Sequence, residues 1–332
     1  METPLAPSSD PATNALYEQL GSNFDHIPAK FTFSHLREDL RSITHPDNLC
    51  HLPVFTPEVR KQIFSELSAD IRTGKHFAIV EADSDQLKSA NQQISRHFGD
   101  LTIIASAAQH TQTLETLEIT DQPMVFRSTE GGDELHIIFR NINESDKPKI
   151  ISYVKSMNSQ TRKVHPHLSK REFILSSSTG VAFSDEPGFA NEFTLTSDKL
   201  SKGEIPHAFN FIEDVKDRAN DRAGSTKVLH ELEQLPVDQL LSMNPQEFTD
   251  FESDRFGGLR VSKGGRKILN MINQTITYRW FRAQLSPDSS LPAIPTASPL
   301  SDDTFISTQD KPTLRQIVDQ WKQIFITKSS PN

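Results

Sequence analysis

The sequence predicts an α+β protein with a mainly antiparallel sheet built from two βα units, followed by a helical C-terminal region. An apolar run over 76–82 precedes a helical pattern over 86–98, and a second apolar run over 135–139 precedes a helical pattern over 147–157. Each of these runs is followed by Asp, Asn or Ser residues that favour a helix N-cap. Two adjacent glycines separate further apolar runs in mid-chain, which is typical of a hairpin.

The composition excludes several functional classes. The chain has 332 residues, a formal charge of −9 and one cysteine, Cys50. An acidic balance argues against nucleic-acid binding, which needs clustered Lys and Arg. No apolar run is long enough to span a membrane. A single cysteine forms no intrachain disulfide and no multi-cysteine zinc site, and we expect neither a metal nor a cofactor.

The N-terminal part divides into two segments. Residues 1–14 are rich in Pro and Ser without periodicity, so we expect a disordered tail. This tail lacks the charged and apolar regions of a secretory signal peptide, and a polar tail of this kind is typical of type III secretion signals. Residues 15–73 form a helical segment, in which Thr56 is a suitable N-cap for an amphipathic helix that begins at Pro57.

Residues 74–235 are predicted to form the α+β core domain. Its first strand, a helix and a strand over 101–105 would make a βαβ unit. The residues Glu130-Gly-Gly-Asp lie between two apolar runs and predict a hairpin. The remaining expected strands cover 172–179, 193–195 and 207–212, and a helix follows over 225–235. The expected order places the helices on one face of the sheet.

The C-terminal part is predicted to contain three segments. Residues 236–285 are a helical region whose strongest pattern covers 268–285. Residues 286–311 are rich in Pro, Ser and Asp and are expected to be a flexible linker. Residues 312–332 are expected to form a C-terminal helix and tail.

Histidine and basic residues on the two strands are the first candidates for chemistry. His136 and Arg140 share one face of an extended strand, where Arg can grip a phosphate and His can exchange a proton. Lys75 and His76 begin the first strand as a candidate base and acid. The alternative is that these side chains are surface or packing groups of a non-catalytic protein-interaction module.

A second alternative is an ADP-ribosyltransferase. Such an enzyme needs an Arg on a strand, then a Ser-Thr-Ser-like strand, then a catalytic Glu. Arg140, the run 176–179 and either Glu213 or the pair Glu231 and Glu233 occur in that order. The motifs of the P-loop, the dinucleotide-binding fold, the zincins and the α/β-hydrolases are absent from the sequence.

The segment 74–187 resembles the Hop A family of type III secreted effectors. The matching pieces are Gly74-Lys-His-Phe-Ala-Ile-Val-Glu-Ala, Glu134-Leu-His-Ile-Ile-Phe-Arg and Ser178-Thr-Gly-Val-Ala-Phe-Ser-Asp-Glu-Pro. The same arrangement is similar to that of effector phosphothreonine lyases, which are carbon-oxygen lyases. The resemblance implies Lys75 as base, His76 or His136 as acid, and Arg127 with Arg140 as phosphate ligands.

The resemblance also implies a biological setting. A virulence effector of this kind is secreted into a host cell and acts on or binds a host protein. A secretion chaperone would bind its N-terminal region. Without secretion, the protein is expected in the cytoplasm.

Overall fold

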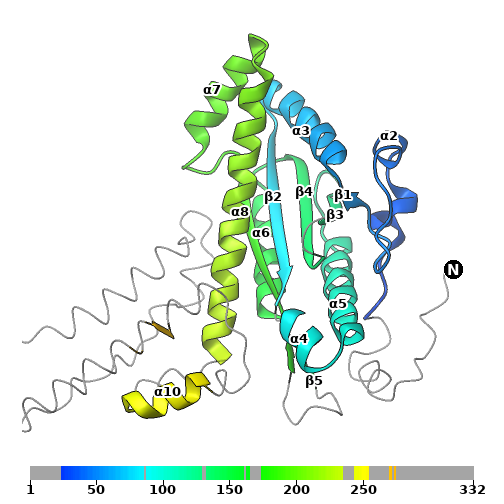
Figure 1. Cartoon of the computed structure of the whole chain (residues 1–332). Helices are drawn as coiled ribbons and strands as arrows, with labels where there is room; N and C mark the ends of the chain where they lie inside the picture. The colour runs from blue at the N-terminus through cyan, green and yellow to red at the C-terminus, as the bar shows by residue number, and fades with distance from the viewer. Residues whose placement is uncertain are drawn as a thin grey trace, which may run out of the picture. The chain divides into compact units, whose positions relative to one another are not determined.

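The computed structural model describes residues 24–85, 87–128, 132–160, 162–164, 173–234, 243–253, 269–270 and 273. The chain divides into two compact units, residues 1–223 and 224–332. The first unit contains the main sheet (Figure 1). The predicted tail 1–14, linker 286–311 and C-terminal helix lie outside the described residues, as does most of the pattern 268–285.

The described elements follow one another in this order: η1 (Ala29–Phe31), η2 (Phe33–His35), α2 (Glu38–Arg41), β1 (Val54–Phe55), α3 (Pro57–Arg72), β2 (His76–Ser84), α4 (Leu87–Gln93), α5 (Arg96–Glu115), β3 (Met124–Ser128), β4 (Glu134–Ile142), α6 (Lys147–Ser159), β5 (Arg162–Val164), β6 (Phe173–Leu175), β7 (Ser177–Phe183), α7 (Ala190–Ser201), α8 (Ile205–Gln234) and α10 (Pro245–Ser253). No helix in the described part of the chain is long and apolar enough to cross a membrane.

The main sheet has five strands in the order β1-β3-β4-β2-β7, and β5 pairs separately with β6. The α+β class is therefore confirmed. The main sheet is mixed, however, because β1 pairs with β3 in parallel while the other neighbours are antiparallel. The two-residue strand β1 carries too short an apolar pattern to be predicted, and it adds the parallel pairing that the sequence analysis missed.

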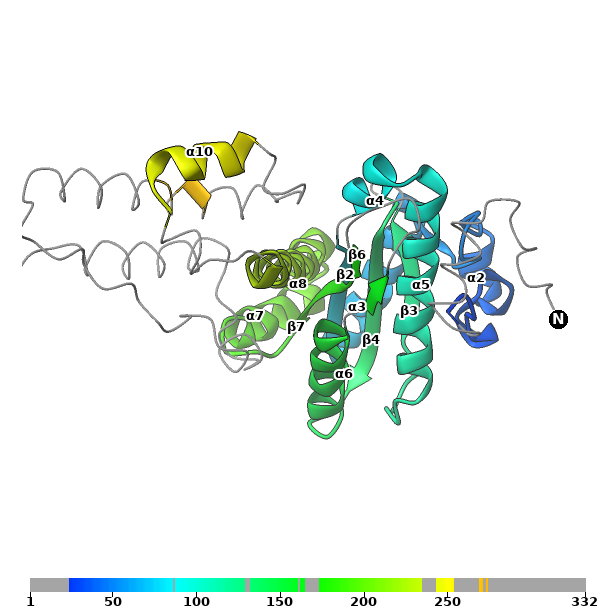
Figure 2. The ribbon, with the colours of Figure 1, turned by 90° about the horizontal axis from the view of Figure 1, so that it is seen from below.

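Helices cover both faces of this sheet, so the prediction of helices on one face was wrong. Ala78 and Val80 of β2 pack with residues of α5 and α6, on what we call the α5/α6 face. Phe77 and Ile79 pack with residues of α3, α7 and α8, on the α3/α8 face. Figure 2 shows α8 and α5 on opposite sides of the strands. The nearly continuous apolar run of β2 is what burial on both faces requires.

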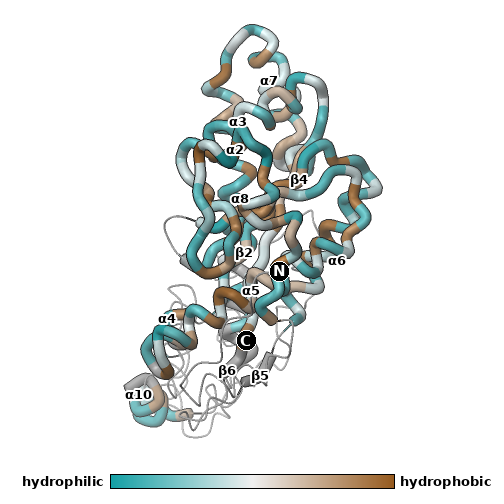
Figure 3. The backbone as a smooth tube through the Cα atoms, turned by 90° about the vertical axis from the view of Figure 1, so that its right-hand side faces the viewer, coloured by the Kyte–Doolittle hydropathy of each residue, from teal (hydrophilic) through white to brown (hydrophobic). Residues whose placement is uncertain are grey.

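Several predicted elements are confirmed. Helix α3 begins after Thr56, whose hydroxyl accepts a hydrogen bond from the backbone N–H of Val59 at 3.2 Å. Strands β3 and β4 form the expected antiparallel hairpin. Helix α6 occupies the predicted region and alternates hydrophobic and hydrophilic residues along its length (Figure 3).

Three predicted strands are helical. The run 101–105 lies inside α5, 193–195 inside α7 and 207–212 inside α8. Each run includes β-branched or aromatic residues, which favoured strands. Burial nevertheless recurs every three or four residues, as a helix requires. The buried positions that show this spacing are Leu101, Ile104, Ala108 and Thr111 in α5, and Phe193, Thr196 and Leu200 in α7.

Candidate functional site

Acidic residues meet where β2 ends and β4 begins. Asp83 lies near the end of β2, and its cross-strand partner is Glu134, the first residue of β4. Directly opposite residues of an antiparallel pair lie on the same face, with Cβ atoms about 5 Å apart. Asp83 and Glu134 are both partly exposed, as is Asp133 in the preceding turn. The fold therefore gathers carboxylates at one solvent-accessible edge of the sheet.

The turn that carries Asp133 is held by a buried arginine. Arg127 at the end of β3 is 4% exposed, and its Nη2 donates a hydrogen bond to the carbonyl of Gly132. Gly132 has a φ of +78°, which a residue without a side chain adopts at little cost. Arg127 thus links the hairpin to its own turn and holds the acidic residues at the start of β4.

Asp85 connects the end of β2 to β7. Its two carboxylate oxygens accept hydrogen bonds from the hydroxyls of Ser176 at 2.7 Å and Ser178 at 2.6 Å. Its backbone N–H donates to the carbonyl of Ser176 at 2.9 Å. The carboxylate is buried, so Asp85 stabilises the edge on which Asp83 lies.

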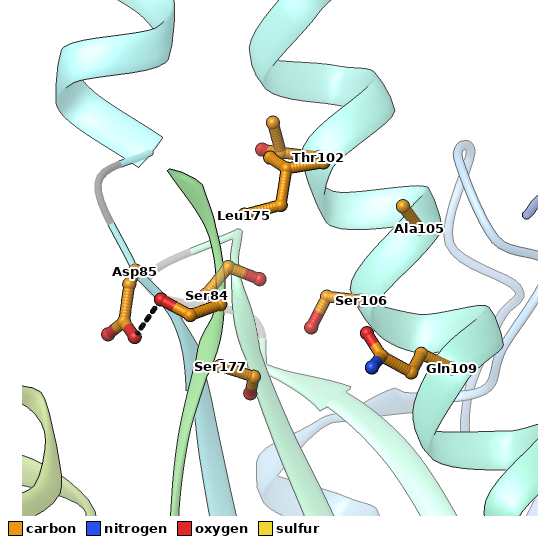
Figure 4. A pocket seen from close by; sticks show the side chains of 9 residues that line it. Ser84, Asp85, Thr102, Ala105, Ser106, Gln109, Leu175 and Ser177 are labelled. Carbon is orange, nitrogen blue, oxygen red and sulfur yellow. Dashed lines mark hydrogen bonds between the residues drawn. The ribbon is translucent and has the colours of Figure 1, made fainter. Parts of the chain in front are cut away.

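A small polar pocket lies beside this edge, between the strand ends and α5. Figure 4 shows Ser106 and Gln109 extending from α5 toward the strands, with Ser84 and Ser177 across from them. The Ser84 hydroxyl is buried and has no hydrogen-bond partner in the described structure. The lining of the pocket combines hydroxyl groups, the Gln109 amide and the Asp85 carboxylate, which already accepts from Ser176 and Ser178.

A buried histidine lies behind the pocket. The ring nitrogens of His110 lie 2.5 Å from the Tyr153 hydroxyl and 2.9 Å from the Ser177 hydroxyl. Burial lowers the pKa of His110 from 6.5 to about 3, because the charged ring would lose its hydration. Burial also raises the pKa of the Tyr153 hydroxyl. Both groups are therefore neutral at pH 7 and act as hydrogen-bonding parts of the core.

We expect the free energy of unfolding to fall as the pH is lowered from 6.5 toward 3. In this window the unfolded chain binds a proton at His110 that the folded chain does not. The expected slope from this one residue is about 1.4 kcal/mol per pH unit. Urea unfolding of the protein and its His110→Gln variant at several pH values measures it. Equal slopes in the two proteins would contradict the assignment.

Glu81 and His136 form a second buried polar pair, on the α3/α8 face. They are cross-strand partners on β2 and β4. The neighbouring pair on the same face, nearer to the β3–β4 turn, is Asp83 and Glu134. The Glu81 carboxylate lies 2.7 Å from Nδ1 of His136, and the two residues are 5% and 7% exposed. The His136 ring packs on Phe55, with centroids 4.7 Å apart.

The structure does not bring the predicted anion-binding residues together. His76 and His136 lie at opposite ends of the β2–β4 pair, since His136 faces Glu81, five residues along β2 from His76. That separation is roughly 17 Å at the rise of a strand. Arg127 follows Phe126, the cross-strand partner of His136, so its side chain points to the opposite face.

The other predicted residues have structural surroundings. Arg140 donates to the Asp70 carboxylate at 2.7 Å and also pairs with Glu66, so β4 is fastened to α3. These carboxylates raise the pKa of Arg140. Lys75 is exposed. Lys75 and Arg140 therefore lie at the His76 end of the β2–β4 pair, away from His136 and its partner Glu81.

The sequence analysis missed the acidic residues of this edge. It assigned the Asp-Ser-Asp run at the end of the first strand to helix capping, and it assigned the Gly-Gly-Asp segment only to a hairpin. The available signal was the recurrence of carboxylates next to two predicted strand ends. Knowledge of which strands pair, and in which register, was needed to show that Asp83 faces Glu134.

A divalent cation fits the donor set at this edge. Carboxylate oxygens are the ligands that Mg²⁺ prefers, and Mg²⁺ is commonly held by one or two carboxylates with substrate phosphates completing its shell. Among the residues that the structure describes, no group of three or more His, Cys, Asp or Glu could hold a metal alone. A cation here would therefore need ligand oxygens from a substrate.

One family model matches part of the chain. Residues 57–198 match the family model of the diguanylate cyclase GGDEF domain. No curated protein matches the chain with significance. The segment 57–198 contains β2, β3 and β4 and therefore the whole acidic edge.

Three solved structures illustrate the likeness. A sensory box/GGDEF family protein from Caulobacter crescentus has 18% identity, with 47% of this chain and 94% of that chain covered and a TM-score of 0.33. The GGDEF domain of DgcB from the same organism, in complex with c-di-GMP, has 17% identity, coverages of 51% and 94%, and a TM-score of 0.34. Diguanylate cyclase SiaD from Pseudomonas aeruginosa, in complex with its activator SiaC, has 17% identity, coverages of 49% and 57%, and a TM-score of 0.30.

The family match corrects the functional reading of the sequence. It covers the segment 74–187, so the resemblance to Hop A effectors was wrong, and the effector and phosphothreonine lyase readings are wrong with it. The ADP-ribosyltransferase and interaction-module alternatives gain no support from this match. The host protein and secretion chaperone were inferred from the effector resemblance and have no support here. Secretion itself stays a prediction that no finding tests.

Proposed function

We propose that residues 57–198 act as a diguanylate cyclase domain, which forms cyclic diguanylate from two guanosine triphosphates. One observation carries this proposal. The segment that matches the family contains Gly131-Gly132-Asp133-Glu134-Leu135, and the last residues of this run stand opposite the end of β2.

This run agrees with the five letters of the family name except at its last position, where Leu replaces Phe. Leu135 is 2% exposed and packs in the apolar cluster of the α5/α6 face. A smaller apolar side chain at a buried position keeps β4 anchored beside the turn. The change therefore leaves the acidic residues of the run in place, and the run retains the groups that can do chemistry.

The product dictates what the site must do. Each phosphodiester bond of cyclic diguanylate forms when the 3′ oxygen of one nucleotide attacks the α-phosphorus of the other. The bond from that phosphorus to the pyrophosphate oxygen breaks, pyrophosphate leaves, and the hydroxyl proton is released. Enzymes accelerate such transfers mainly by positioning the two oxygens and stabilising the phosphoryl charge.

The residues at the edge match these needs. Asp83 and Glu134 would hold the metal, with nucleotide phosphates completing its shell. A bound Mg²⁺ would offset the charge of the phosphates and orient them. Arg127 fixes the Gly132 carbonyl and Asp85 fastens the end of β2, so both supporting segments are held in place. Each copy of the domain has one acidic edge of this kind. We therefore propose that two copies meet around two nucleotides, so that both phosphodiester bonds can form.

The test is direct formation of the product. The purified full chain is incubated with guanosine triphosphate and MgCl₂, and cyclic diguanylate and pyrophosphate are quantified by liquid chromatography with mass spectrometry. We expect two pyrophosphates per cyclic product and complete loss of product when EDTA removes the metal. A folded protein that binds the nucleotide but makes no product, with Mg²⁺ or Mn²⁺, would overturn the proposal.

A further inference from the structure

We infer that the small polar pocket beside the acidic edge is a binding site for an ordered water molecule, which ties α5 to the end of β2. The pocket lies between α5, the last residues of β2 and the start of β7 (Figure 4). Its side chain from β2 is that of Ser84, which points to the α5/α6 face because Ser84 alternates with Ala82 along the strand. The inference therefore concerns the face of β2 opposite to Asp83 and is independent of the proposed function.

The Ser84 hydroxyl is the observation that points to a ligand. Ser84 is 3% exposed and lines the pocket, and its hydroxyl has no hydrogen-bond partner among the described protein groups. An unpaired buried hydroxyl is unfavourable, and native proteins usually satisfy such a group with a protein partner or an ordered water. A molecule that pairs with Ser84 in the pocket would lie between β2 and α5.

Ser177 faces Ser84 across the strands and presents a proton to the pocket. The two residues are cross-strand partners, so their Cβ atoms lie about 5 Å apart. The buried Tyr153 hydroxyl pairs its one proton by donating it to Nδ1 of His110, so the neutral ring donates from Nε2 to Ser177. The Ser177 proton lies 3.4 Å from the Asp83 carbonyl by its hydroxyl oxygen, which is long for such a bond. This proton is therefore suited to a ligand in the pocket.

Water matches the groups that line the pocket. Helix α5 adds the Ser106 hydroxyl and the Gln109 amide, which extend toward the strands (Figure 4). Gln109 donates from Nε2 to Gln160, so its Oε1 can accept. A water can accept from Ser177, donate to Gln109 and pair with Ser84, and a buried water typically has two to four such partners. The cavity volume of about 20 Å³ exceeds the roughly 10–15 Å³ that one buried water needs.

A monovalent cation is the alternative occupant, and the contacts favour water. Among the residues that line the pocket, Asp85 carries the charge that would attract a cation. Its two carboxylate oxygens already accept from Ser176 at 2.7 Å and Ser178 at 2.6 Å. The proton that Ser177 presents repels a cation, whereas a water oxygen accepts it.

The sign of one change in stability tests the inference. Ser84→Ala removes the hydroxyl and little else. If water fills the pocket, the variant loses a satisfied hydrogen bond, and we expect the melting temperature of the full chain to fall by about 2–4 °C. In a dry pocket the same change removes an unpaired buried hydroxyl, so the melting temperature would rise. A rise, or no change, would overturn the inference.

Thr179→Val is the matched control. The Thr179 hydroxyl is also buried without a partner among the described protein groups, and it lies on the same face of the neighbouring strand β7. Thr179 does not line the pocket. Its replacement should leave the melting temperature unchanged or raise it, because an unpaired polar group is lost. A fall as large as that of Ser84→Ala would show that loss of any hydroxyl on this face destabilises the sheet, and the inference would fail.

Two further measurements identify the occupant. A high-resolution crystal structure of the full chain should show an electron-density peak about 2.7–3.0 Å from the hydroxyls of Ser84 and Ser177. An empty pocket would overturn the site. Melting of the unmodified protein and Ser84→Ala in NaCl, KCl and choline chloride, at equal ionic strength, should give the same difference in all three salts. A difference that appears only with Na⁺ or K⁺ would show that the occupant is a cation and not water.

Discussion

Replacing Asp83 by Asn is expected to lower the rate of cyclic diguanylate formation by about 100-fold or more, and Glu134→Gln should have a comparable effect. Both residues lie at the acidic edge and face one another across β2 and β4. An amide supplies a weaker, uncharged ligand, so the cation that offsets the phosphoryl charge would be bound less tightly. Product formation at fixed and at raised Mg²⁺ concentrations measures the effect.

Asp198→Asn supplies the control for this prediction. It makes the same chemical change at an exposed position of α7, away from the strands of the site. Its activity should equal that of the unmodified protein. If Asp83→Asn and Glu134→Gln both kept full activity at every Mg²⁺ concentration, the acidic edge could not be where phosphoryl transfer occurs.

Local signals predicted part of the fold. The cap at Thr56, the continuous apolar run of β2 and the two glycines between β3 and β4 each act within a few residues, and the elements they predict are present. Parts of the helices α5, α7 and α8 were predicted as strands because those parts include β-branched or aromatic residues, which favour strands. The sheet determines which face of these segments is buried. This tertiary information, which the sequence pattern lacks, made the segments helical.

The site was less accessible to sequence reasoning than the fold. Attention went to His76, His136 and the basic residues, because those types commonly carry acid–base and phosphate chemistry. His136 lies next to the acidic edge, but as the partner of Glu81 and not of a basic residue. The two carboxylates that face one another are far apart in the sequence. Only the register of β2 against β4 makes them neighbours, and no local pattern encodes that register.

The strands of the site are also supported by β7 and α8. Strand β7 flanks β2 on the side opposite β4, and Asp85 joins them. Helix α8 approaches β7 very closely at Gly180, where an added Cβ would lie 2.2 Å from the carbonyl oxygen of Ala219. The position of β2 therefore depends on how α8 is attached to β7.

Glu186→Ala is expected to destabilise the protein by about 3–5 kcal/mol, because it breaks the buried ion pair that attaches α8 to β7. The Glu186 carboxylate accepts from both terminal nitrogens of Arg222, at 2.8 and 3.1 Å. The side chains of Glu186 and Arg222 are 6% and 5% exposed. Without Glu186, the buried Arg222 guanidinium keeps its hydrogen bond to the carbonyl of Val181 but loses both hydrogen bonds to the Glu186 carboxylate. Urea unfolding and thermal denaturation measure the change.

The contrast with Arg218 makes this prediction specific. Arg218 also contacts Glu186, at 3.0 Å, but its side chain is 41% exposed. Glu186 keeps its pairing with Arg222 when the contact with the exposed Arg218 is lost, so Arg218→Ala should cost about 1 kcal/mol or less. Glu186→Ala should lower the melting temperature by roughly 6–20 °C for a unit of this size. Equal losses for the two variants would mean that burial of the Glu186–Arg222 pair does not determine its contribution, and that α8 is held to β7 chiefly by the apolar contacts of the α3/α8 face.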